Sequence, residues 1–95
     1  MAEFVRLCDD AISRAQELKQ SSAEAGDQAR VALADRAISI LQMERNAALE
    51  GRIGGRSQGF GFGPTRFVSD NDWGPRGEAL VEAVYRLQDH WSRNT

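Results

Sequence analysis

The chain has 95 residues, of which 41% are hydrophobic and 27% are charged, and its net charge is -2. This hydrophobic content suffices for one folded domain and excludes a wholly disordered chain. The slightly acidic balance excludes general polyanion binding over the whole surface, because affinity for phosphates comes from accumulated positive potential.

The cysteine count and the hydropathy pattern predict where the protein resides. A single cysteine, Cys8, cannot form an intramolecular disulfide, which fits a reducing compartment. We see no apolar run of about 18 residues for a membrane span and no secretory signal. We therefore expect a cytoplasmic protein with no membrane partner. Eleven arginines against one lysine, together with thirteen alanines, favour a bacterial or phage gene.

The first predicted helix spans about residues 3–22. Its apolar residues recur at intervals of three and four, the period of one helix face. They are Phe4, Cys8, Ala11, Ile12, Ala15 and Leu18. Gly26 can end the helix in the left-handed conformation, and Asp27 can cap the next one. An alternative boundary is a capping box that starts at Ser21 with Glu24. Either boundary predicts a tight helical hairpin.

The second predicted helix spans about residues 28–50 and carries two apolar stripes. One stripe is Val31, Ala34, Ile38, Leu41 and Ala48, and the other is Leu33, Ala37, Ile40 and Ala47. A helix with two apolar flanks packs against two neighbours. One neighbour is the first helix, and the other is the third helix or a second copy of the chain. We expect a helical-bundle homodimer with the interface residues Val31, Leu33, Ala37, Ile40 and Leu41.

A glycine-rich loop follows at residues 51–66. It holds six of the nine glycines and three arginines, and it holds no acid. Such a stretch cannot build a core, so it is either a disordered connection or a contact surface. Trp73, on a turn beyond the loop, is either an exposed contact or a core residue. The predicted partner-binding residues are Arg52, Arg56, Phe60, Phe62, Arg66, Phe67 and Trp73.

The third predicted helix spans about residues 75–92. Asp72 or Gly74 can cap it, and Pro75 suits its first turn because no hydrogen bond is lost there. The apolar stripe contains Leu80, Val84, Leu87 and Trp91. Before this helix, Phe67 and Val68 are expected to form a short extended piece. The sequence thus predicts an all-α fold over residues 1–95, a single helical domain made of a hairpin, a loop and a C-terminal helix.

Residue types that carry catalysis or bind metals are few. Cys8 lies on the apolar stripe of the first helix, as expected of a buried hydrophobe, and His90 is the only histidine. The glycine-rich loop lacks the terminal Gly-Lys-Ser/Thr of a phosphate-binding loop. We therefore predict no enzyme activity, no metal and no cofactor.

The functional prediction is a small non-enzymatic interaction protein. A regulator, inhibitor or adaptor that binds a larger protein would use the loop phenylalanines as apolar contacts and the arginines as hydrogen-bond donors. The alternative is a nucleic-acid-binding regulator, in which the same arginines and aromatics contact phosphates and bases.

Overall fold

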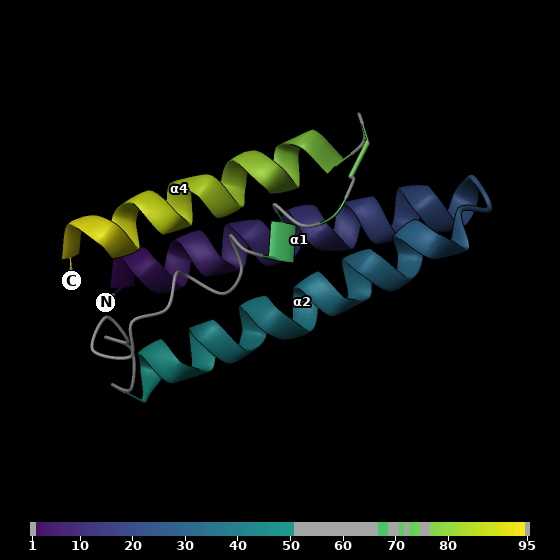
Figure 1. Ribbon diagram of the computed structural model, residues 1–95. Coiled ribbons are helices and arrows are strands. Elements are labelled where there is room, and N and C mark those ends of the chain that lie inside the picture. The colour runs from purple at the N-terminus through teal and green to yellow at the C-terminus, as the bar shows by residue number, and fades with distance from the viewer. Residues whose placement is uncertain (1, 51–66, 69–70, 72, 75–76, 95) are drawn as a thin grey trace.

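Figure 1 shows the computed structural model of the chain. The structure describes residues 2–50, 67–68, 71, 73–74 and 77–94, and within the helices it leaves the side chains of residues 2, 91, 92 and 94 undescribed. These residues contain no strand, and the helices are α1 (Ala2–Glu24), α2 (Gln28–Leu49) and α4 (Glu78–Asn94). The predicted all-α hairpin with a C-terminal helix is confirmed. The predicted loop at 51–66 lies outside the described residues, as does the side chain of Trp91.

The helix α1 is the shared neighbour of the other two. It runs antiparallel to α2 and antiparallel to α4, so both chain ends lie at the same end of the molecule (Figure 1). Both α2 and α4 pack against α1, whereas no Cα atoms of the two described helices α2 and α4 come within 8 Å of each other. The helix α4 therefore does not lie directly against α2, and a lateral face of α2 is left without α4 beside it.

The turn between α1 and α2 ends the first helix and caps the start of the second. Gly26 has a φ of 76°, the left-handed conformation that glycine adopts at little cost. The amide of Asp27 donates to the Ser22 carbonyl at 2.8 Å, and the amide of Gly26 donates to the Ala23 carbonyl at 3.1 Å. These two bonds satisfy carbonyls that the end of α1 would leave unpaired. Asp27 then caps α2 by accepting the Arg30 amide proton at 3.1 Å, which confirms the predicted boundary.

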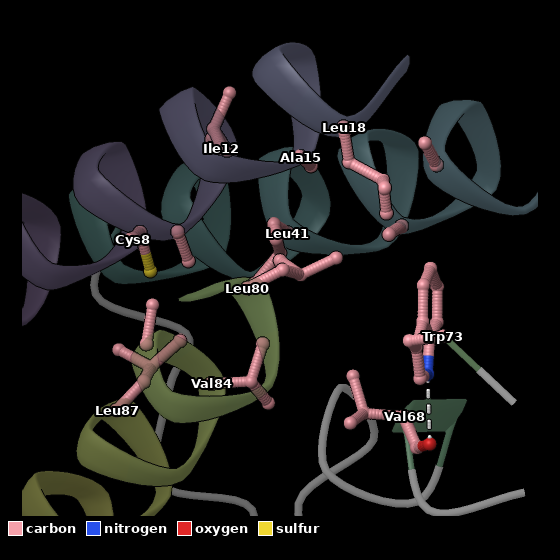
Figure 2. Close-up of a cluster of buried hydrophobic side chains, with 14 of the residues drawn as sticks. Cys8, Ile12, Ala15, Leu18, Leu41, Val68, Trp73, Leu80, Val84 and Leu87 are labelled. Carbon is pink, nitrogen blue, oxygen red and sulfur yellow. Dashed lines mark hydrogen bonds between the residues drawn. The ribbon is translucent and has the colours of Figure 1, made fainter. Parts of the chain in front are cut away.

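The core lies between the three helices and is rich in small residues. Figure 2 shows side chains of α1, α2 and α4 pointing toward one another around Leu41 and Leu80. Alanines at five buried positions of α1 and α2 let these two helices approach closely. They are Ala11, Ala15, Ala34, Ala37 and Ala48. Two ion pairs, Arg45–Asp9 at 2.5 Å and Lys19–Asp35 at 2.9 Å, link α1 to α2 at the surface.

Phe67 and Val68 are helical, so the predicted extended piece is wrong. Their carbonyls accept hydrogen bonds from side chains farther along the chain, and not from a neighbouring strand. The Asn71 side-chain amide donates to the Phe67 carbonyl at 2.8 Å, and the Trp73 indole N–H donates to the Val68 carbonyl at 2.9 Å (Figure 2). These bonds stabilise a compact turn, because carbonyls at a helix end need donors.

The start of α4 is displaced from about residue 75 to Glu78. Gly74 has a φ of 65°, a turn conformation unlike the extended one that an N-cap residue adopts. The Gly77 amide donates to the Gly74 carbonyl at 3.1 Å and closes this turn. A Cβ atom on Gly77 would lie 2.5 Å from the Cβ of Trp73, so only glycine fits there without a shift. The helix α4 therefore begins only after the turn that follows Trp73.

Arg30 connects the hairpin turn to the segment that precedes α4. Its Nε–H donates to the Trp73 carbonyl at 3.2 Å, and its Nη1 lies 2.7 Å from the Asp27 carboxylate. The α2 cap and the Trp73 backbone are thus held by one guanidinium. A planar guanidinium with several donors suits such a role.

We predict that Trp73→Ala lowers the free energy of unfolding by about 3–5 kcal/mol, because it leaves a cavity where a large ring was buried. Trp73→Phe keeps most of the ring and loses the hydrogen bond to Val68, so we expect a loss of about 1–2 kcal/mol. Urea denaturation followed by far-UV circular dichroism measures both. Gln16→Ala, on an exposed position of α1, is the control. Equal stability of Trp73→Ala and wild type would contradict the burial of this ring.

Candidate interaction surface

The predicted partner-binding residues divide into two groups in the structure. Five of them lie outside the described residues, namely Arg52, Arg56, Phe60, Phe62 and Arg66. The other two, Phe67 and Trp73, contact each other, with ring centroids 5.6 Å apart and planes at 71°. This edge-to-face arrangement is favourable for aromatic pairs.

Trp73 is a core residue, which is one of the two positions that the sequence left open for it. Only 4% of it is exposed, and Figure 2 shows its indole nitrogen directed at the Val68 carbonyl. A buried indole needs a partner for its N–H, and this carbonyl supplies one. The sequence left the burial of Trp73 open because the residue lies on a turn with no helical period around it.

Phe67 remains half-buried and borders an apolar hollow between α2 and α4, a packing gap too small to admit a water molecule. The hollow is lined by Ala37, Ile40, Leu41, Phe67, Val68 and Val84. All six side chains are apolar, so the hollow has no group that would orient a polar ligand. The edge-to-face contact with Trp73 restricts the position of the Phe67 ring.

The predicted dimer-interface residues also divide into two groups. Ala37 and Leu41 are 2% and 1% exposed, and they face the core of this chain. They are therefore already covered within the single chain, and their role in a dimer interface stays a prediction. Val31, Leu33 and Ile40 are half-buried and keep part of their surface open. The buried positions of α2 come from both predicted stripes, because α1 covers the helix along the line between them.

A lateral face of α2, here called the α2 flank, combines apolar and charged side chains. Its members are Leu33, Arg36, Ile40, Met43, Glu44 and Ala47. They recur at intervals of three and four residues and therefore share one side of the helix. Met43 is 70% exposed, the most exposed large hydrophobic side chain of the described residues. Ile40 joins the flank to the hollow beside Phe67.

The two charges of the α2 flank have no ion-pair partner among the described residues. Arg36 is exposed, whereas Glu44 is half-buried. Burial raises the pKa of the Glu44 carboxyl, because a low-dielectric environment disfavours its charged form. A cation placed against Glu44 would offset that cost. The apolar stripes in the sequence do not include Arg36, Met43 and Glu44. Their spacing around Ile40 was the signal that could have indicated this face of α2.

A polar depression of about 350 Å³ lies between α1 and α2, away from the α2 flank. Its lining residues are Asp9, Ile12, Gln42, Arg45 and Asn46. Asp9 and Arg45 pair with each other there. Their charges are therefore used in joining α1 to α2, and we assign no ligand to this depression.

Cys8 and His90 do not form a reactive pair. Cys8 is fully buried, and burial raises the pKa of its thiol to about 12, with the nearby carboxylates of Glu44 and Asp9 adding to the shift. The thiolate is the reactive form, so this cysteine acts as a small hydrophobic residue. His90 lies beside Phe4, with ring centroids 6.3 Å apart. Among the described residues, no group of three or more His, Cys, Asp or Glu side chains could hold a metal ion.

Comparisons with protein-family models, with curated proteins and with solved structures found no match for this chain. No helix among the described residues combines the length and the apolar character needed to cross a membrane. Function is therefore inferred from the geometry of Phe67 and the α2 flank, and from the sequence of residues 51–66.

The buried state of Cys8 makes a direct prediction about thiol reactivity. At pH about 8, a disulfide exchange reagent should modify the folded protein at least about a hundredfold more slowly than the urea-unfolded protein, because few molecules carry the thiolate. Spectrophotometric titration of the released thiol measures both rates. Cys8→Ser gives the background signal. Rapid stoichiometric modification of the folded chain would contradict the buried position.

Proposed function

We propose that this chain is a non-enzymatic interaction protein, a bacterial or phage regulator, inhibitor or adaptor that docks on a larger protein in the cytoplasm. One observation carries the proposal. Phe67 is half-buried, so part of its ring remains at the surface, and the ring is in edge-to-face contact with the buried Trp73. An aromatic side chain with a fixed position loses little conformational freedom on binding, which makes it a good anchor.

The sequence adds candidate contact groups in the residues that precede Phe67 in the chain. Arg52, Arg56 and Arg66 precede Phe67, together with Phe60 and Phe62, although all five lie outside the described residues. Arginine and aromatic residues are enriched where proteins bind each other, because guanidinium groups make directional hydrogen bonds and rings bury a large apolar area. In the sequence, this group begins shortly after the end of α2 and ends directly before Phe67.

Partner capture tests this proposal. The tagged protein should enrich one protein from a bacterial extract, and quantitative mass spectrometry should show about tenfold less of it with Phe60→Ala/Phe62→Ala and with Arg52→Ala/Arg56→Ala/Arg66→Ala. Arg86→Ala, which removes an exposed charge from α4, is the matched control and should leave capture unchanged. The proposal fails if both multiple variants capture the protein as well as wild type does, or if wild type enriches none.

A nucleic-acid-binding regulator is the second candidate, favoured by the charge distribution. Residues 51–66 carry three arginines and no acid in a chain of net charge -2. Contacts from these three arginines to a single strand would give a salt slope of about -2, or roughly a 20-fold loss of affinity between about 50 and about 200 mM salt. Fluorescence anisotropy with a labelled oligonucleotide measures this loss. No binding at low salt would remove this candidate.

A further inference from the structure

The order of charges along the α2 flank is symmetric about one apolar residue. Arg36 lies four residues before Ile40, and Glu44 lies four residues after it. The positive charge and the negative charge are therefore equally far from Ile40 on the same side of the helix. A contact between two copies of one surface requires this kind of self-complementarity, because each residue must face a suitable residue of its partner.

We propose that the α2 flank is the contact surface of a homodimer, in which the α2 helices of two copies pack antiparallel across a two-fold axis at Ile40. This inference rests on the proposed interaction role and names a second copy of the chain as one partner. In this arrangement Ile40 faces Ile40 of the partner subunit. Arg36 faces Glu44 of the partner subunit, and by symmetry this ion pair forms twice.

The side-chain sizes also fit this pairing. Leu33 faces Ala47 of the partner subunit, so a large apolar residue meets a small one on each side of the axis. Met43, which is 70% exposed in the single chain, lies at the border of the contact. Phe67 and Ile40 line the same apolar packing gap at the edge of the α2 flank.

The charges select the antiparallel orientation and a second copy over other arrangements. Parallel pairing about the same residue would place Arg36 against Arg36 of the partner subunit, and Glu44 against Glu44 of the partner subunit, which is repulsive. The antiparallel pair instead supplies a cation to the half-buried Glu44, which has no ion-pair partner among the described residues of its own chain. An isolated buried carboxylate is costly, and pairing offsets that cost.

Charge reversal with purified protein tests the homodimer. In sedimentation experiments over a concentration series, Arg36→Glu and Glu44→Arg should each weaken association by at least about tenfold, because each places like charges together. The double variant Arg36→Glu/Glu44→Arg should associate to within about threefold of wild type, because it restores opposite charges. Arg86→Glu, an exposed charge reversal on α4, should have no effect. A monomeric wild type, or a double variant no better than the single ones, would overturn the proposal.

Disulfide crosslinking tests the position of the axis independently of charge. With Ile40→Cys the two thiols face each other across the axis, so mild oxidation should give a covalent dimer. The native Cys8 is buried and does not interfere. Ser39→Cys is exposed on α2 but lies off the α2 flank, and it should form no covalent dimer under the same oxidation. Equal crosslinking of the two variants would overturn the placement of the axis at Ile40.

The dimer and the proposed function can fail separately. A chain that remains monomeric yet captures a larger protein through the arginines and phenylalanines of residues 51–66 would overturn the homodimer and leave the proposed function standing. A chain that forms the charge-dependent dimer yet captures no other protein would overturn the proposed function and leave the homodimer standing.

Discussion

The packing of Trp73 is the interaction on which the arrangement of the three helices depends. Its ring is buried against Phe67, its indole N–H is bonded to the Val68 carbonyl, and its own carbonyl accepts a hydrogen bond from Arg30. Gly77 lies so close to it that a Cβ atom would not fit. The segment before α4 is thereby held by Arg30 of α2, by Phe67 and Val68, and by the close approach of Gly77. A short chain with a small core needs such a fixed point, because few other contacts oppose the entropy of the connection.

The position of α4 determines which surface of α2 is left open. Because α4 packs on α1, the two outer helices α2 and α4 do not pack on each other, and the space near the middle of α2 is covered by Phe67 and Val68. The α2 flank thus keeps Met43 exposed and Ile40 and Ala47 half-buried. Among the described residues, the same packing therefore leaves the apolar and charged α2 flank without contact from α4. This is the physical link between the fold and the proposed interaction role.

Local information in the sequence predicted the helices and one turn. Apolar residues at a period of 3.6 indicated all three helices, and the Gly26–Asp27 pair located the hairpin turn because glycine and aspartate have specific backbone roles there. The burial of Trp73 could not be predicted in this way. It depends on a contact with Arg30, which is 43 residues away, and no local pattern encodes that distance. The same holds for Ala37 and Leu41, whose side of α2 faces the core only because α1 and α4 lie where they do.

Amide hydrogen exchange of α4 in the Trp73→Ala variant tests most directly whether Trp73 holds this helix on the hairpin. If it does, the amides of residues 78–94 should lose protection at lower denaturant concentration than those of α1 and α2, because α4 detaches while the hairpin turn keeps its own caps. In Trp73→Phe, the amides of all three helices should lose protection at similar denaturant concentrations. If α4 in Trp73→Ala stayed as protected as α1, another contact would have to hold the C-terminal helix, and the central role given to Trp73 would be wrong.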